Sequence, residues 1–287
     1  MQEKRKLPIF QLSAFIILAF LIVAFFYVAK NEDKPKEEAE GKLETAQTSV
    51  EPAKTVSLDN LTWPENQTVN AAILMYHHIG PLPSDADDIR RGLTVSLENF
   101  EAQMKYLKEN RYNVLTMKQM YTLVAQNKMP VKAVILTFDD GYLDNYLYAD
   151  PVLDSFSFKA TFNIISGMVG DSEYMTEEEI LALSKRGYEI SSHTVSHPSL
   201  EQLSSNALNR ELVDSKIALE KLTGEKVITL CYPAGKYNAE VEAAVKSAGY
   251  KMAITTEASK GTFSTSRPYE IPRYRINPTT QLDRLLK

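Results

Sequence analysis

Residues 133–141 read Ala-Val-Ile-Leu-Thr-Phe-Asp-Asp-Gly, an apolar run that ends in two carboxylates and a glycine. Six β-rich residues followed by a turn signal predict a strand that is buried on both faces. Asp139 and Asp140 then lie at the carboxyl end of this strand. Because adjacent carboxylates repel each other, the pair indicates a bound cation or a shared proton. An ordinary acidic turn closed by Gly141 is the alternative.

Short apolar runs alternate with amphipathic ones on both sides of residues 133–141. The other predicted strands cover residues 71–79, 112–115, 160–165, 188–191, 227–232 and 251–255. The predicted helices cover residues 97–109, 117–126, 143–154, 176–185, 205–222 and 239–247. This α/β alternation predicts a mostly parallel sheet, and the number of strands indicates an eight-stranded (β/α) barrel or a distorted or incomplete one. Functional residues of such folds gather at the carboxyl ends of the strands.

A second polar cluster, His193-Thr194-Val195-Ser196-His197, follows the predicted strand 188–191 and holds two of the four histidines. A His-x-x-x-His spacing puts both imidazoles on one side of a helical turn, where they can share a metal ion. For the spacing alone, a pair of surface or capping histidines is an equal alternative. Combined with the two aspartates, the cluster predicts a site of two histidines and one carboxylate, with positions left open for water and substrate.

Two further strand ends carry polar or turn-forming residues. Tyr232-Pro233-Ala234-Gly235 follows the strand 227–232, and its proline and glycine indicate a turn that lets the backbone approach closely. His77 and His78 come at the end of the first predicted strand. Strand alternation lets only one of these two histidines face the interior of a barrel.

The composition excludes several classes of function. A formal charge of −5 gives no global electrostatic reason to bind nucleic acid or another polyanion. The single cysteine, Cys231, excludes an internal disulfide framework, a cysteine zinc finger and a CxxC redox pair, so any metal site must use His, Asp and Glu. We expect Cys231 itself to be a small buried residue rather than a nucleophile.

The N-terminus predicts a membrane anchor. Lys4-Arg5-Lys6 precedes an uncharged stretch, residues 9–29, that is long enough to cross a bilayer as a helix. The basic cluster before this stretch places residues 1–8 in the cytoplasm and the rest of the chain outside it. We therefore expect a single-pass protein of the cell membrane. A cleaved signal peptide, which would make the protein secreted, is the alternative.

The domain organisation follows from a change in composition. Residues 30–69 are rich in Glu, Lys, Ala, Thr and Ser, which predicts a disordered linker that holds the next domain away from the membrane. Residues 70–287 then form one domain. The expected order is a cytoplasmic segment, an anchor, a linker and a single α/β domain.

Taken together, the clusters resemble the polysaccharide deacetylase family, the NodB-homology carbohydrate esterases. Residues 137–141 (Thr-Phe-Asp-Asp-Gly) look like the first family motif, residues 193–197 like the second and residues 232–235 like the third. The resemblance implies a distorted (β/α) barrel and metal-dependent removal of acetyl groups from a sugar polymer. It also implies that Asp139 is the general base and that Asp140, His193 and His197 bind a divalent cation, which we expect to be zinc, with cobalt or nickel as alternatives.

The chain departs from the usual family pattern in its third, fourth and fifth motifs. The arginine that usually orients the base two residues before the third-motif proline is replaced by Cys231. No fourth motif is visible near residues 255–263, and residues 271–276 lack the histidine that usually serves as the general acid. A branch that resembles biofilm-polysaccharide deacetylases begins its domain with Tyr-His, which Tyr76-His77 matches, so we assign the acid role to His77. Arg273 is a candidate partner for Asp139, although Arg273 and Arg275 could instead form a solvated strand edge.

The resemblance leads to an expected reaction. We expect a hydrolase that removes acetyl groups from an extracellular amino-sugar polymer such as peptidoglycan, chitin-like chains or poly-N-acetylglucosamine. The backbone N–H of Ala234 is the expected oxyanion donor, because Pro233 has none. The alternatives are a weakly active or inactive carbohydrate-binding relative and an esterase that acts on O-acetylated xylan.

Overall fold

The computed structural model describes residues 57–286. The predicted cytoplasmic segment, the membrane anchor at 9–29 and the linker as far as residue 56 lie outside the described residues. Within residues 57–286, no helix has both the length and the apolar character that a bilayer crossing requires.

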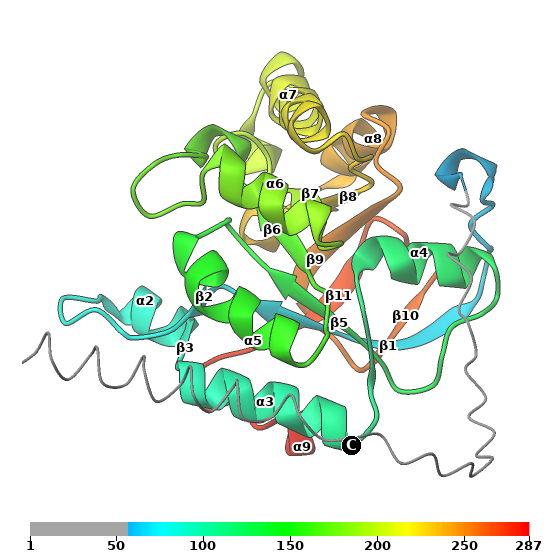
Figure 1. Cartoon of the computed structure of the whole chain (residues 1–287). Helices are drawn as coiled ribbons and strands as arrows, with labels where there is room; N and C mark the ends of the chain where they lie inside the picture. Colours follow the sequence, from blue (N-terminus) through cyan, green and yellow to red (C-terminus); the bar gives the residue numbers. More distant parts are fainter. Residues whose placement is uncertain (1–56, 287) are drawn as a thin grey trace, which may run out of the picture. The chain divides into compact units, whose positions relative to one another are not determined.

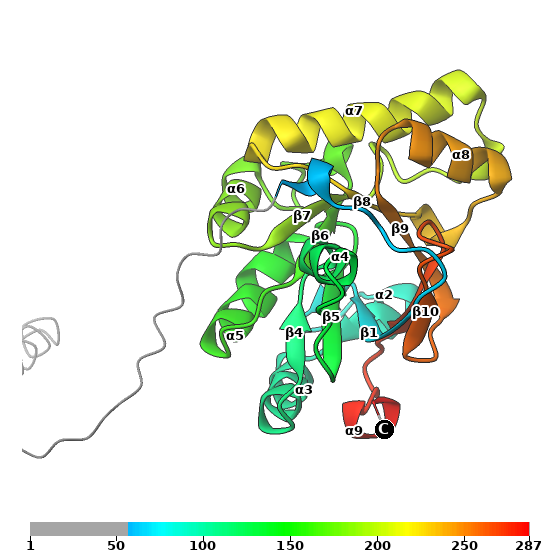
Figure 2. The same cartoon turned by 90° about the vertical axis from the view of Figure 1, so that its right-hand side faces the viewer.

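Seven parallel strands close into a barrel that is surrounded by helices, which confirms the predicted barrel class (Figures 1 and 2). Neighbouring strands follow the chain except at the closure, where the last strand pairs with the first. In barrel order they are β1 (Thr68–Tyr76), β5 (Ala133–Phe138), β6 (Thr161–Ile164), β7 (Glu189–Ser192), β8 (Thr229–Cys231), β9 (Met252–Ala258) and β11 (Ile271–Arg275).

The closing strand β11 was not predicted as part of the barrel. Its polar sequence, Ile-Pro-Arg-Tyr-Arg, lacks the apolar character of a buried strand. It pairs with β9 on one side and with β1 on the other, so the barrel closes with seven strands rather than eight. The short strands β2 (His78–Ile79), β3 (Thr94–Val95), β4 (Asn113–Leu115) and β10 (Thr262–Ser264) lie outside the closed ring.

The main helices lie close to their predicted bounds. They are α3 (Leu97–Glu109), α4 (Met117–Ala125), α5 (Asp150–Ser155), α6 (Glu177–Lys185), α7 (Ser205–Thr223) and α8 (Ala239–Ser247). Capping boxes begin two of them: Thr116 with Gln119 at α4 and Thr176 with Glu179 at α6. Gly224, in the left-handed conformation, ends α7. Shorter helices are α2 (Asp88–Leu93) and α9 (Leu282–Leu285).

The predicted helix 143–154 is helical from residue 143, but it is not an α-helix throughout. Residues 145–149 form a π-helix, η2 (Asn145–Ala149), and α5 follows it. The buried side chain of Asn145 donates from Nδ2 to the backbone oxygen of His77, 2.6 Å away. The irregular turn therefore fastens the end of β1, which is where the sequence predicted a functional histidine.

The ordered domain begins before the predicted boundary at residue 70. The turn η1 (Leu58–Asn60) is formed, Trp63 stacks on Tyr121 of α4, and Trp63 Nε1 donates to the oxygen of Thr265. The linker prediction was therefore wrong for residues 57–69. The three apolar side chains Leu58, Leu61 and Trp63 have a core to pack against, which the average composition of the stretch concealed.

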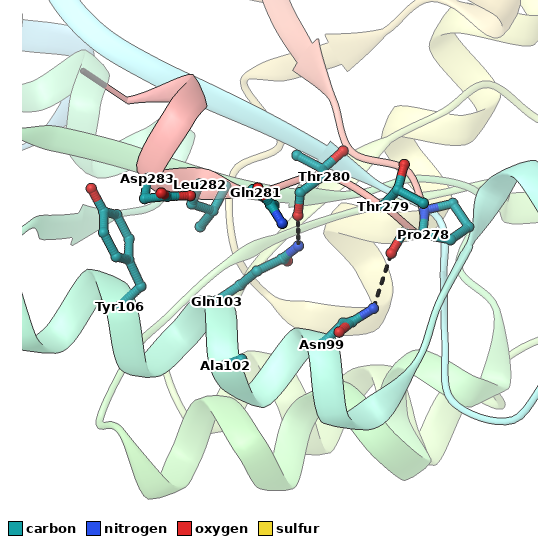
Figure 3. A pocket seen from close by; sticks show the side chains of 10 residues that line it. All are labelled: Asn99, Ala102, Gln103, Tyr106, Pro278, Thr279, Thr280, Gln281, Leu282 and Asp283. Carbon is teal, nitrogen blue, oxygen red and sulfur yellow. Dashed lines mark hydrogen bonds between the residues drawn. The ribbon is translucent and has the colours of Figure 1, made fainter.

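The C-terminal segment is fastened to α3, as Figure 3 shows. Asn99 Nδ2 donates to the oxygen of Pro278, and Gln103 Nε2 donates to the oxygen of Thr280. Gln103 also accepts from the hydroxyl of Tyr76 in β1, 2.8 Å away. The cavity between α3 and this segment contains none of the predicted site residues.

Side chains alternate between two cores. One set, such as Leu74, Leu136 and Phe138, packs with the surrounding helices. The opposite set packs with α4 and with residues 58–63, which close the amino-terminal end of the barrel (Figure 2). This second set includes Ile73, Ile135 and Ile271. Toward the carboxyl ends of the same strands, side chains of this second parity become polar, and they form the candidate site.

Candidate active site

Strand parity brings the predicted residues together at the carboxyl ends of the barrel strands. The side chain of Asp139 points to the same side of its strand as those of Ala133 and Ile135. The side chain of Arg273 likewise points to the same side as that of Ile271. His77 has the parity of Ile73 and Met75. The alternation that the sequence shows along each strand therefore aims these polar side chains at the same mouth.

Asp139 is held by three donors inside the barrel. Arg273 forms a bidentate pair with it, from Nη1 to Oδ1 at 2.8 Å and from Nη2 to Oδ2 at 2.7 Å. Asn163 Nδ2 donates to the same Oδ1 at 2.7 Å. Arg273 is fully buried, so the solvated strand edge is wrong for this residue, whereas Arg275 is exposed. Oδ1 therefore accepts two short bonds, whereas Oδ2 accepts one from Arg273 and only a long contact, 3.5 Å, from Cys231 Sγ.

The arginine keeps Asp139 ionised. Burial alone would raise the pKa of Asp139, but the charge and hydrogen bonds of Arg273 hold the pKa well below the ordinary value of a carboxyl group. The carboxylate is thus available as a proton acceptor over the whole working pH range.

The carboxylate of Asp140 faces the two histidines that were predicted as metal ligands, and it points away from the carboxylate of Asp139. Its Oδ1 lies 3.4 Å from His193 Nε2 and 3.8 Å from His197 Nε2. A left-handed turn at Asp140 (φ 76°) and Gly141 (φ 84°) separates the directions of the adjacent carboxylates. Tetrahedral ligands bonded to zinc at about 2.0–2.2 Å lie roughly 3.3–3.6 Å apart. The three groups therefore fit a small divalent cation.

The backbone around the two histidines is not helical, in contrast to the prediction from their spacing. Residues 193–198 form a loop in which Thr194 (φ 69°) and His197 (φ 57°) take the left-handed conformation. The rings meet edge to face with centroids 4.7 Å apart. His193 Nδ1 bonds to the oxygen of Cys231 at 2.7 Å, which leaves Nε2 for a metal ion.

A second group with metal-ligand spacing, Asp139, His193 and Cys231, shares His193 with the first. It is the poorer site for a cation, because Arg273 already binds both oxygens of Asp139 and lies 3.2 Å from Cys231 Sγ. Burial also raises the pKa of the Cys231 thiol, so a neutral buried thiol fits this position. The residue that replaces the family arginine thus makes room for the guanidinium of Arg273.

The two adjacent histidines have different surroundings. His77 Nε2 lies 4.0 Å from Asp139 Oδ2, beyond direct hydrogen bonding but close enough for both groups to act on one small substrate group. His78 points the other way, where its Nδ1 bonds to Asp144 at 2.8 Å and its ring packs on Tyr142. Burial lowers the pKa of His77, and the Asp139 and Asp140 carboxylates oppose this shift.

Ala234 lies in the tight turn η5 (Pro233–Gly235) with a left-handed backbone (φ 52°). Within residues 57–286, no hydrogen bond uses its amide N–H, and the residue is exposed. The next residue must be glycine, because a Cβ on Gly235 would lie 2.0 Å from Thr256 Oγ1. The turn therefore presents the one predicted backbone donor to solvent or substrate.

Sequence reasoning missed two contributors to this region. Asn163 has no motif around it, and only its parity within β6 could have placed it in the barrel. Tyr174 stacks on Tyr142 with centroids 5.2 Å apart, and an isolated bridge joins the two residues. Burial and the Asp140 carboxylate both raise the pKa of Tyr142, so its hydroxyl stays protonated beside Asp140.

Comparison with known proteins agrees with this arrangement. The family described as polysaccharide deacetylase matches residues 126–253. YxkH of Bacillus subtilis, which is named for the polysaccharide deacetylases, is 36% identical over 72% of this chain and 71% of its own length. A poly-beta-1,6-N-acetyl-D-glucosamine N-deacetylase of Staphylococcus aureus is 27% identical over 95% of the chain and 93% of its own. The solved Streptococcus pyogenes deacetylase PplD, in complex with acetate, is 31% identical with a TM-score of 0.71, over 77% of this chain and 98% of its own.

Proposed function

Because this chain belongs to the polysaccharide deacetylase family and is therefore a hydrolase, we propose that it removes N-acetyl groups from an amino-sugar polymer outside the cytoplasm. The proposal rests on two groups of side chains that lie at the carboxyl ends of the barrel strands. An ionised Asp139 lies beside His77, and Asp140 lies beside His193 and His197. A hydrolase of acetamides needs a base, an acid and a centre that polarises the carbonyl group.

Asp140, His193 and His197 are the residues that would hold the cation, for which nitrogen and oxygen ligands favour zinc. When bound, a divalent cation acts as a Lewis acid that polarises the acetyl carbonyl and makes water a better nucleophile. Cobalt and nickel suit the same ligands.

Asp139 serves as the general base in this proposal. Oδ2 accepts the proton of the attacking water, while Arg273 and Asn163 hold Oδ1 and fix the plane of the carboxylate. The bidentate pair takes the place of the arginine that the third motif lacks. The amide of Ala234 donates to the carbonyl oxygen as negative charge develops on it.

His77 serves as the general acid. The C–N bond breaks only when the departing nitrogen receives a proton, because an amide anion is a poor leaving group. Arg273 and Arg275 retain their protons at any working pH, so the strand that usually supplies the acid cannot do so here. His77 Nε2 lies 4.0 Å from Asp139 Oδ2, and His77 is the imidazole beside the base that is not assigned to the cation.

The polymer is expected to carry N-acetylglucosamine, which is supported by the similarity to the S. aureus enzyme along almost the full chain. The basic residues before the apolar stretch at 9–29 support a location outside the cytoplasm with a membrane anchor. An inactive carbohydrate-binding relative is disfavoured, because such a protein needs no buried ionised Asp139.

The test is acetate release by the purified full chain from a panel of polymers. The panel contains β-1,6-linked and β-1,4-linked N-acetylglucosamine oligomers, peptidoglycan and O-acetylated xylan, each with and without a chelator. We expect chelator-sensitive acetate release from the N-acetylated substrates. Release from xylan alone would make the protein an O-acetyl esterase, and binding without release would make it a carbohydrate-binding relative.

A further inference from the structure

The two histidines of the candidate metal site are held in different ways. The ring of His193 is fixed by its bond to the Cys231 oxygen. In residues 57–286, the ring of His197 has no side-chain hydrogen bond of this kind, and its side chain is 36% exposed. Only its backbone is held, by the bond from its N–H to Thr194 Oγ1 at 3.0 Å. The position of the His197 ring therefore depends on the backbone of residues 194–197.

That backbone is strained. Thr194 and His197 both take left-handed conformations, and Thr194 is a β-branched residue, for which this conformation is rare. Such conformations are energetically unfavourable and persist only where the surrounding structure imposes them. The loop must therefore be held from outside.

Glu211, in the second turn of α7, supplies one side of that restraint. Its Oε2 accepts from the N–H groups of Val195 at 2.8 Å and Ser196 at 2.9 Å. Its Oε1 accepts from Ser196 Oγ at 2.7 Å. One carboxylate thus binds three donors of the segment that lies between the left-handed residues. Bonds to a charged acceptor are stronger than neutral ones.

The other side of the loop rests on the backbone after β6. The N–H groups of Ser166 and Gly167 donate to the oxygens of Thr194 at 3.0 Å and Val195 at 2.8 Å. A Cβ at Gly167 would lie only 2.5 Å from the Val195 oxygen. The backbone of residues 166–167 therefore lies close against the loop, which is held between this backbone and Glu211.

We propose that Glu211 is a positioning residue for the metal site. It holds residues 194–197 in the conformation that brings His197 Nε2 to Asp140 and His193. The inference rests on the metal site of the proposed function and adds a residue beyond the family motifs. Because outer-shell partners typically change metal affinity 10–100-fold, the effect is expected in zinc binding itself.

The experiment is a calorimetric zinc titration of the metal-stripped full chain. Glu211→Ala should weaken zinc binding roughly 10–100-fold. Glu211→Gln keeps one acceptor oxygen, so its zinc affinity should lie between those of the wild type and Glu211→Ala. The matched control is Asp214→Asn, which changes an exposed carboxylate on the same helix and should leave zinc affinity unchanged. Thermal unfolding of each metal-free variant separates loss of affinity from loss of fold.

A wild-type dissociation constant in folded Glu211→Ala would overturn the inference, as would an equal loss in Asp214→Asn. Acetate release, measured on the same samples, keeps the two proposals apart. If zinc binding weakens in Glu211→Ala while the wild-type protein binds zinc but releases no acetate, the positioning role stands and the deacetylase proposal fails.

Discussion

At the scale of single residues, the two carboxylate oxygens of Asp139 have different partners. Oδ1 accepts from Asn163 and Arg273, whereas Oδ2 accepts from Arg273 and faces His77. A buried carboxylate without these donors would be protonated and useless as a base. Asp139→Asn should therefore keep the fold and at least part of the zinc affinity, while kcat falls roughly 10²–10⁴-fold. Steady-state acetate release checks this, and near-normal turnover would rule out the base role.

The bidentate arginine leads to a prediction about pH. Burial raises the pKa of Asp139 and Arg273 lowers it, so Arg273→Lys, which cannot form the fork, should raise this pKa. A raised pKa means that Asp139 takes up a proton at higher pH, and the acidic fall in kcat/KM should move upward. The pH profile of the folded variant measures the shift. An unmoved profile would show that Arg273 does not control the base.

The adjacent histidines provide a matched pair for the acid role. His77→Ala should retain zinc and lose roughly 10²–10⁴-fold in amide hydrolysis, with a smaller loss on an activated ester whose leaving group needs no proton. His78→Ala, which breaks the bond to Asp144, should be the milder change for the chemical step. The reverse order of effects would assign the acid to His78, and two mild effects would place it elsewhere.

At the scale of elements, the sequence predicted whatever depends on local pattern. The helices α3 and α8 have the predicted bounds, because their caps and apolar spacing are local. Elements set by distant contacts were missed. The polar strand β11 is stabilised by pairing with β1 and β9 and by the bond from buried Arg273 to Asp139, some 130 residues earlier in the chain.

The distinction between local patterns and distant contacts also explains which features of the candidate site could be predicted from the sequence. The strand ends predicted that the aspartates and the histidines would meet, and strand alternation predicted that only one of His77 and His78 would face inward. The resemblance to the branch with a Tyr-His element selected His77. The His-x-x-x-His spacing predicted a shared site but suggested the wrong backbone, since the loop is imposed by bonds from Glu211 and from the backbone after β6. Asn163 and Tyr174 were missed because no local pattern distinguishes them from core or loop residues.

The segment before β1 belongs to the folded domain and should contribute to its stability. A chain that begins at residue 70 lacks Trp63 and its contacts with Tyr121 and Thr265. Its free energy of unfolding should fall by about 2 kcal/mol or more relative to a chain that begins at residue 57. Denaturant unfolding of the two chains measures the difference. Equal stabilities would return the boundary to residue 70.

At the scale of the whole molecule, one end of the barrel is covered and the other carries the candidate site. The amino-terminal end is closed by α4 and by residues 58–63, and the polar side chains gather toward the carboxyl ends of the strands. Two cavities beside α3, of about 560 and 640 Å³, contain none of the predicted site residues, so the site was found from the strand ends and not from a cavity.

The central claim is that one divalent cation, held by Asp140, His193 and His197, is required for acetate release. The most direct measurement is a zinc titration of the metal-stripped full chain in which bound zinc and acetate release from N-acetylglucosamine oligomers are followed together. Activity should rise in proportion to bound zinc and level off at one equivalent, and His193→Ala should show neither zinc binding nor turnover. Acetate release by the metal-free protein, or normal zinc content in His193→Ala, would contradict the claim.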